Sequence, residues 1–368
     1  MRYPAGHAGV TMQRLYLDWN ATAPIRAEAR AAMIAAMDLV GNPSSVHSEG
    51  RAAKSLMERA RAQIATAIGA DGQDIVFTSG ATEAAALALE GRGIVCAEVE
   101  HDAVKAWCDP LLPVDGYGRV TVADPAQATL QLANSETGVI QDLPEGLWAS
   151  DLTQAFGKIP VAFNWLGATA GIVSAHKLGG PKGIGALILR RGTDLASRLK
   201  GGGQEMGRRA GTENLIGIAG FAAAAEAAAR DLANGVWDEV AEIRDILKSA
   251  LEDCGEKLYF PGWELPEGQA GNAAPPQILP NTLSVISPGW KGETQVMRLD
   301  LLGFAVSAGS ACSSGKVRAS HVLGAMGWSG EDAACALRVS IGPGVSREDI
   351  LRFADTFVAA HRKHRMRR

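Results

Sequence analysis

Short apolar runs alternate with longer helix-forming segments along the first two thirds of the chain, and this alternation restricts the fold more than any other feature. The runs are rich in Ile, Val, Leu and Ala and have the length of buried strands; they lie at 74–78, 94–97, 129–133 and 186–189. Segments with helical character lie at 28–38, 51–68 and 215–232. Strands that alternate with helices in this way predict an α/β domain whose sheet is largely parallel.

The pattern changes at Val236. A long amphipathic helix is predicted to begin there, and a Pro- and Gly-rich stretch follows at 261–280. A strand at 281–286, a helix near 293–302 and a closing helix after Arg347 come next. This part of the chain is therefore predicted to form a smaller α+β domain.

Composition excludes several classes of protein. Among 368 residues, 36 Lys and Arg against 40 Asp and Glu leave a net charge of −4, which provides no basic surface for nucleic acid. The shares of hydrophobic residues (47%) and charged residues (21%) are typical of a globular protein. No apolar run reaches the ~18 residues of a membrane helix, and residues 1–13 lack the apolar region of a signal peptide.

The cysteines are odd in number and widely spaced, at Cys96, Cys108, Cys254, Cys312 and Cys335. Because no two of them form a C-x-x-C pair, neither a zinc site nor a disulfide framework is predicted, and no metal is expected. A reduced, cytoplasmic protein is the simplest interpretation. Cys312 lies among small residues at 307–315, where a thiol can be exposed, whereas the other four have the surroundings of packing residues.

Lys177 lies in a Gly- and Pro-rich segment, 174–185, directly before the apolar run at 186–189. A lysine in a restricted polar pocket can lose its proton and form a Schiff base with an aldehyde, and pyridoxal 5′-phosphate (PLP) is the common aldehyde cofactor. PLP makes three further demands. It needs a phosphate site, an acid beside the pyridine nitrogen and a side chain that covers the ring.

Each of these demands has a candidate in the sequence. The turn at 78–83 offers hydroxyl and N–H groups to a phosphate, although a helix cap explains it equally well. Asp151 and Gln154 place an acid and an amide together, and Asp151 is either the partner of a pyridine nitrogen or a cap. His101 is either the ring cover or a structural histidine. Arg338 pairs either with a substrate carboxylate or with an internal acid.

Together these motifs resemble those of the cysteine desulfurases of the nitrogen-fixation and iron–sulfur-cluster type, in the class V group of PLP enzymes. The matching stretches are 16–24, 41–47, 77–83, 100–104, 136–141, 151–158, the Lys177 segment, 201–205, 209–212, the Cys312 loop and the Arg338 strand. The resemblance implies the α/β PLP-dependent transferase fold type I. It implies a large PLP-binding domain at 25–235 with a mixed, mostly parallel seven-stranded sheet, a small α+β domain at 236–368 with the Cys312 loop, and residues 1–24 joining the small domain.

The resemblance also implies roles for the residues around the cofactor. Lys177 would carry PLP as a Schiff base, and Asp151 would pair with its pyridine nitrogen. His101 would stack on the ring, and Gln154 would bind the ring oxygen O3′. The phosphate would be held by Ala81, Thr82, Ser174, His176 and, from the second subunit of a homodimer, Thr212.

For the reaction, the resemblance implies that Lys177, Cys312 and His101 are catalytic and that Asn134 and Arg338 bind the substrate L-cysteine. Lys177 would take the α-proton, the ring would delocalise the charge, and the Cys312 thiolate would attack the substrate sulfur. Alanine would leave. The persulfide on Cys312 would pass to a sulfur-acceptor protein that serves iron–sulfur cluster assembly or the synthesis of another sulfur-containing cofactor or tRNA.

The sequence also departs from the family. Ser135 stands where relatives usually have a second Asn that contacts the cofactor or the substrate. Only residues 142–150 separate Gln141 from Asp151, where relatives fit a helix and a strand and where a parallel crossover needs ~10–12 residues or more. Two alternatives stay open: another fold-type I PLP lyase or aminotransferase acting on selenocysteine or a sulfinate, and a non-catalytic sulfur-transfer scaffold.

Overall fold

The computed structural model describes residues 14–269, 273–309 and 319–366. Its central sheet has four strands in the order β2 (Asp74–Thr78), β7 (Gly185–Leu189), β6 (Ala168–Ser174) and β5 (Leu147–Asp151). Strand β7 is antiparallel to both of its neighbours, whereas β5 and β6 are parallel. The predicted strands at 74–78 and 186–189 are confirmed as β2 and β7.

Three further segments continue this sheet beyond β5. The segment 128–132 is extended, and its backbone N–H groups donate to Val95 O, Ala149 O and Asp151 O. It therefore joins β5 to the parallel pair β3 (Val95–Ala97) and β4 (Asp109–Leu112). In the described part of the chain, seven extended segments thus lie side by side, as expected for a mixed, mostly parallel sheet of seven strands.

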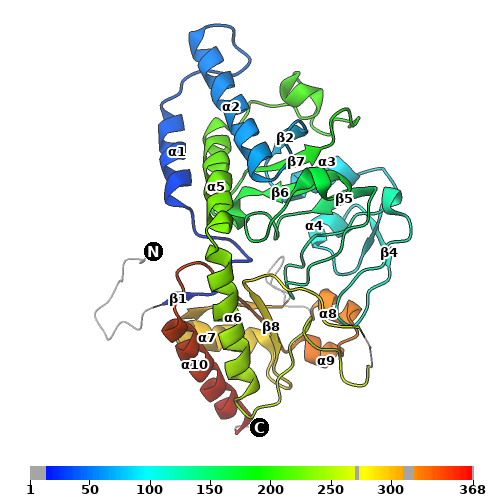
Figure 1. Cartoon of the computed structure of the whole chain (residues 1–368), viewed down its shortest axis with the longest axis vertical. Helices are drawn as coiled ribbons and strands as arrows, with labels where there is room; N and C mark the ends of the chain where they lie inside the picture. Colours follow the sequence, from blue (N-terminus) through cyan, green and yellow to red (C-terminus); the bar gives the residue numbers. More distant parts are fainter. Residues whose placement is uncertain (1–13, 270–272, 310–318, 367–368) are drawn as a thin grey trace.

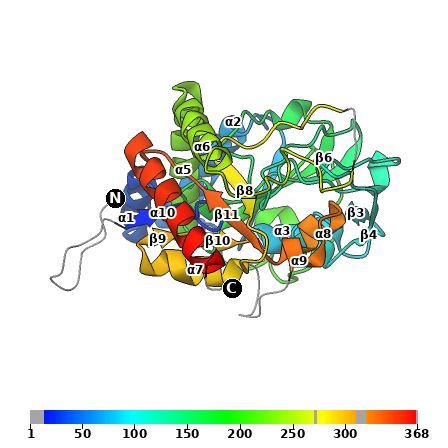
Figure 2. The ribbon, with the colours of Figure 1, turned by 90° about the horizontal axis from the view of Figure 1, so that it is seen from below.

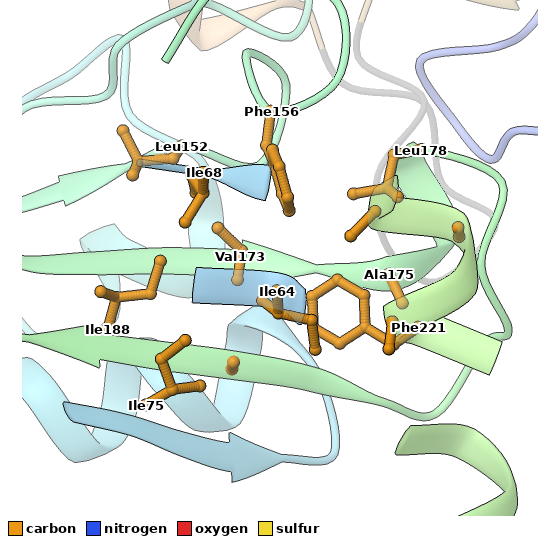
Figure 3. Close-up of a cluster of buried hydrophobic side chains, with 14 of the residues drawn as sticks. Ile64, Ile68, Ile75, Leu152, Phe156, Val173, Ala175, Leu178, Ile188 and Phe221 are labelled. Carbon is orange, nitrogen blue, oxygen red and sulfur yellow. The ribbon is translucent and has the colours of Figure 1, made fainter. Parts of the chain in front are cut away.

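Helices cover both faces of the sheet (Figure 1). The helices α1 (Ala27–Met37), α2 (Ser48–Ala67) and α5 (Leu215–Ala233) pack together on one face, and α3 (Ala81–Leu89) packs against β6 and β7 on the other, near α4 (Asp102–Lys105). The strand residues alternate accordingly: Ile75, Val173 and Ile188 point to the α2–α5 side (Figure 3), and their chain neighbours Val76, Ile172, Leu187 and Leu189 point to the α3 side. This alternation is what a sheet buried on both faces requires.

The smaller unit has its own sheet and its own core. Its strands run in the order β10 (Ser307–Ala308), β11 (Ala336–Ser340) and β8 (Thr282–Ile286), all antiparallel. The helices α7 (Gly292–Leu301) and α10 (Arg347–Arg365) lie beside this sheet (Figure 2), together with α6 (Val236–Glu252), and α8 (His321–Ala325) and α9 (Gly330–Ala333) complete the unit. Its cluster of buried side chains is separate from the cluster around the large sheet.

The N-terminal segment joins this smaller unit through strand β1 (Leu15–Tyr16), which pairs in parallel with β9 (Phe304–Ala305). Helix α5 continues almost directly into α6 through Gly235, whose φ of 72° is the left-handed conformation that glycine adopts readily. Both observations support the domain limits 1–24, 25–235 and 236–368, which stay predictions. Short 3₁₀ turns occur at Pro125–Gln127, Phe163–Trp165, Ala175–Lys177 and Gln204–Gly207.

The short segment before Asp151 contains a strand but no helix. Strand β5 occupies its second half, and no helix is assigned within the described residues 133–146. The chain instead turns back on itself at 134–139, where Asn134 N donates to Val139 O and Gln141 N to Leu132 O. An antiparallel return thus replaces the crossover helix expected in relatives.

None of the described helices is both long enough and apolar enough to cross a membrane.

The core side chain of Phe221 should contribute strongly to stability. It is fully buried in α5 and packs against Phe156, with the two ring centroids 6.5 Å apart. Phe221→Ala should lower the free energy of unfolding by about 3–5 kcal/mol, because it removes buried area and leaves a cavity. Urea unfolding measures the change.

Leu301→Ala is the matched control for this prediction. Leu301 is 77% exposed at the C-terminal end of α7, so its truncation should change the free energy of unfolding by no more than about 0.5 kcal/mol. Equal effects of the two substitutions would contradict the assigned core.

Candidate active site

Lys177 lies in the tight turn between β6 and β7. Its neighbours Ala175 and Leu178 are buried in the large core and anchor the turn (Figure 3), whereas Lys177 itself stays partly exposed. Gly185 is required next to the turn, because a Cβ there would lie 2.5 Å from Val173 O. The Nζ atom of Lys177 donates to Asn20 O at 2.5 Å and to Ala21 O at 3.0 Å.

The structure brings His101 and Asp151 into the electrostatic environment of Lys177. Asp151 ends β5, and its Oδ1 accepts from Thr153 N at 2.9 Å. His101 caps α4, with Nδ1 accepting from Ala103 N at 3.1 Å. Burial lowers the pKa of His101, Asp151 opposes this effect, and the positive charge of Lys177 reinforces it. His101 thus has a structural role as the cap of α4, and this role does not conflict with a second one for the ring.

Gln154 belongs to a buried polar network beside Lys177. Its Nε2 donates to Asn20 O at 3.0 Å, so Gln154 and Lys177 share one carbonyl acceptor. Lys158 donates to Gln154 Oε1 at 2.6 Å and to Asn20 Oδ1 at 3.0 Å. Neither Lys158 nor Asn20 has a role that the sequence predicts. The spacing of Lys158 four residues after Gln154, in an otherwise apolar segment, was the available signal.

The residues expected at the phosphate lie where β2 and β6 end. Helix α3 begins at Ala81 and Thr82, and the first N–H groups of a helix have no partner within the helix. A Cβ placed on Gly80 would lie 3.8 Å from Ser174 Oγ, so the two turns adjoin. Burial lowers the pKa of His176 to about 4, and positive charge from Lys177, Lys182 and Lys158 adds to this effect. A helix N-terminus beside several cations is a fitting place for an anion.

Arg338 is 6% exposed and forms the internal ion pair that the sequence allowed as an alternative. Its NH2 group contacts Asp18 Oδ1 at 2.8 Å, and NH1 donates to Ser135 O at 3.0 Å. The Nε group is buried and has no hydrogen-bond partner among the described residues. Arg338 therefore keeps a donor for a further group.

The side chain of Asn134 is occupied by the turn it begins. Its Oδ1 accepts from the backbone N–H groups of Glu136 and Thr137, and its Nδ2 donates to Val99 O at 3.0 Å. The backbone of Ser135, not its short side chain, faces Arg338 and Asn20.

Of the two remaining predicted residues, the structure describes Thr212 but not Cys312. Thr212 is exposed in the turn before α5. The preceding 3₁₀ turn, Gln204–Gly207, is held by the buried Glu205, which accepts from Arg61 at 2.9 Å and from Phe77 N at 2.9 Å. Cys312 lies outside the described residues.

Glu136 is a buried acid for which the sequence predicts no role. Burial raises its pKa to about 7, and the hydrogen bond from Ser320 Oγ at 2.5 Å and the charge of Arg338 lower it less. The sequence signal for Glu136 was its place in the matching stretch 136–141.

Known proteins with similar sequences identify the family of this chain. A model described as aminotransferase class-V matches residues 15–353. The chain is 36% identical to a protein from Dictyoglomus turgidum named cysteine desulfurase IscS, over 92% of each chain, and 38% identical to a cysteine desulfurase from Cereibacter sphaeroides, over 86% of this chain and 87% of the relative. The chain belongs to the aminotransferase class-V family. Within it, these relatives place the chain among the cysteine desulfurases.

Solved structures agree with this family. A NifS-like protein from Rickettsia africae superimposes with a TM-score of 0.82 at 29% identity, covering 94% of this chain and 99% of that one. A cysteine desulfurase from Thermococcus onnurineus shares the fold, with a TM-score of 0.78 at 20% identity. The expected PLP-dependent transferase fold type I is confirmed.

PLP is the cofactor of this family, and the residues of this chain fit it. An aldehyde needs a lysine, and Lys177 lies at the end of β6. A phosphate needs donors, and the N-terminus of α3 lies beside Ser174 and His176. A pyridine nitrogen needs an acid. Asp151 is the candidate, because Asp151 and Lys177 both act on the pKa of His101 and therefore belong to one site.

The raised pKa of Glu136 makes the free energy of unfolding depend on pH. The folded protein holds this proton up to about pH 7, whereas the unfolded chain releases it near 4.5. The contribution of Glu136 is therefore fully present below about pH 4.5 and is lost as the pH rises to about 7. Glu136→Gln should remove this loss, which is about 1.4 kcal/mol for each unit of pKa shift.

Urea unfolding of wild type and Glu136→Gln across this pH range measures the effect. The difference between the two proteins separates Glu136 from His176, whose lowered pKa gives the opposite slope: stability from His176 is lost as the pH falls from 6.5 to about 4. Parallel pH profiles for the two proteins would refute the shift at Glu136.

Proposed function

We propose that the protein is a PLP-dependent cysteine desulfurase that converts L-cysteine to L-alanine and takes the sulfur as a persulfide on Cys312. The observation that carries the proposal is the position of Lys177 at the end of β6, with Asp151 and His101 acting on the same site. The named relatives support the same activity, since both are cysteine desulfurases.

The cofactor-binding residues have separate tasks in this proposal. Lys177 holds PLP, Asp151 holds the pyridine nitrogen, Gln154 binds the ring oxygen and His101 covers the ring. PLP supplies an electron sink for the carbanion that forms at the substrate α-carbon. The phosphate is held by Ala81, Thr82, Ser174 and His176.

The substrate is held and deprotonated by residues of this chain. Arg338 binds the carboxylate with the donor that Asp18 and Ser135 leave to it, and Asn134 supports it by fixing the turn that presents Ser135 O. Lys177 Nζ takes the α-proton, because it is the amine at the end of β6, where its position is fixed by hydrogen bonds to Asn20 O and Ala21 O.

Sulfur transfer needs the Cys312 thiolate. The thiolate attacks the substrate sulfur, the carbon–sulfur bond breaks with its electron pair left on carbon, and a proton then completes alanine. The thiolate and the transferred sulfur form the persulfide, so no external oxidant is consumed. A sulfur-acceptor protein in the cytoplasm then removes this sulfur, for iron–sulfur clusters or for another sulfur-containing cofactor or tRNA.

Two substitutions separate the roles of lysine and cysteine. Lys177→Ala should abolish the visible absorbance of bound PLP and all alanine release from cysteine. Cys312→Ser should keep that absorbance but lower sulfide release by at least about 10²-fold, as expected when a nucleophile is removed. Absorbance spectra and alanine and sulfide assays make the measurement.

Cys254→Ser is the control, because Cys254 lies after α6 in the small unit and should leave both readouts unchanged. Full sulfide release by Cys312→Ser would favour a PLP lyase of the selenocysteine or sulfinate type. Wild-type protein that binds no PLP would favour a non-catalytic scaffold.

A homodimer completes the site in this proposal. Thr212 is exposed, and apolar side chains are exposed around α1 and the loop after it: Ile34 (53%), Met37 (59%), Val40 (91%) and Val46 (87%). A second copy would cover such side chains and bring its Thr212 to the phosphate. Sedimentation velocity should give about twice the chain mass of 38.4 kDa. A PLP-loaded species of a single chain would rule the dimer out.

A further inference from the structure

Lys158 is a buried lysine that the proposed reaction does not use. It lies four residues after Gln154 in the turn that follows β5, and it is 1% exposed. Its Nζ donates to Gln154 Oε1 at 2.6 Å and to Asn20 Oδ1 at 3.0 Å. Burial of a lysine head group carries a large desolvation penalty, so these contacts are its compensation.

These contacts determine the orientation of the Gln154 amide. A lysine ammonium only donates hydrogen bonds, so it selects the carbonyl oxygen of the amide and not its NH2 group. The Nε2 group therefore faces away from Lys158, and it donates one hydrogen to Asn20 O at 3.0 Å. Lys177 Nζ donates to the same oxygen at 2.5 Å. The Gln154 NH2 group and the Lys177 nitrogen consequently meet at one acceptor.

We infer that Lys158 is a positioning residue: by holding Gln154 Oε1, it keeps the Gln154 NH2 group turned toward Lys177, where this group donates to the ring oxygen of the cofactor that Lys177 carries. The inference rests on the proposed function, because it requires PLP on Lys177. It assigns to Lys158 a role that neither contacts substrate nor transfers a proton.

The charges around this network are mostly positive. Burial lowers the pKa of Lys158 well below its ordinary value, and Lys177 and Arg338 lower it further. Two further groups belong to this environment: the charge of Lys158 acts on His176, and Arg338 is paired with Asp18. The neutral amine of Lys158 would still carry two hydrogens, one for each of its two oxygen acceptors, Gln154 Oε1 and Asn20 Oδ1, so both contacts persist when the proton is lost.

Loss of Lys158 should change the acidity of the nitrogen that carries the cofactor. A donor at the ring oxygen stabilises negative charge there, and this charge is greatest when the Lys177 nitrogen has no proton. The donor therefore lowers the pH at which this nitrogen is deprotonated. Without Lys158 the amide can rotate, the donor is lost and the midpoint rises; loss of a neighbouring positive charge acts in the same direction.

The test is a pH titration of the visible absorbance of the PLP-loaded protein, in the oligomeric state in which it is purified. Lys158→Met keeps an unbranched side chain of similar length and removes its N–H donors, and it should raise the midpoint by about one pH unit, the size expected for one hydrogen bond to a charged group. Lys54→Met, on the exposed face of α2, is the matched control and should leave the midpoint unchanged.

A double-mutant cycle shows whether Lys158 acts through Gln154. Gln154→Leu should itself raise the midpoint, and Lys158→Met should then add little to it. Lys158→Arg, which restores donors, should bring the midpoint back toward the wild-type value. Equal shifts from Lys158→Met with and without Gln154 would overturn the inference, as would an unchanged midpoint in Lys158→Met alone.

Two further outcomes remain decisive. If Lys158→Met does not fold, Lys158→Gln takes its place, because its shorter amide cannot keep the 2.6 Å contact to Gln154 and should also raise the midpoint; no rise would overturn the inference. A wild-type protein without visible PLP absorbance would defeat the proposed function itself. Wild-type absorbance with an unshifted Lys158 variant would defeat only the role of Lys158.

Discussion

The structure around the site depends on the hydrogen bonds of one buried residue, Asn20. This residue is 1% exposed, and its backbone and side-chain polar atoms all have partners. Its partners come from both units: Ser135, Gln154, Lys158, Lys177, Asn281, Thr282 and Ser340. The N-terminal segment thereby joins the turn that carries Lys177 to the small sheet that carries Arg338. A shift of either unit would break contacts at Asn20, so Lys177 and Arg338 are held in one frame.

This frame also explains how several cations are tolerated together. Burial is the main penalty on the charged form of Lys158, and the positive charges of Lys177 and Arg338 add to it. Neutral acceptors offset it: Asn20 O, Asn20 Oδ1 and Gln154 Oε1 accept from the lysines, and Asp18 pairs with the arginine. A site made positive in this way suits an anionic cofactor and a carboxylate substrate. Without these anions the clustered positive charges would repel one another, so the arrangement is consistent with an anion-binding site.

Much of the fold could be predicted because its elements have strong local signals. The strand at 74–78 and the helix at 215–232 show clear apolar patterns, and β2 and α5 lie there. The strands β5 and β6 were missed, because Leu147–Asp151 and Ala168–Ser174 are rich in Ala, Ser and Gly and gain their stability from neighbours on the sheet. The segment 129–133 was predicted as a strand, and the extended segment 128–132 lies there, although only isolated bridges connect it to β3 and β5.

The site could be predicted only where a residue type has a known chemistry. Lys177, Asp151 and His101 were found in this way, and the structure brings them together. Asn20, Lys158 and Glu136 were not. The contacts of Asn20 span 115 to 320 residues of sequence, and no local pattern shows the burial of Lys158 and Glu136. The central claim is that, of the two lysines bonded to Asn20, Lys177 carries PLP and Lys158 only orients its surroundings. Borohydride reduction of the purified protein, followed by digestion and mass spectrometry, tests it most directly: the account predicts the cofactor mass on Lys177 alone, and a label on Lys158, or on neither lysine, would contradict it.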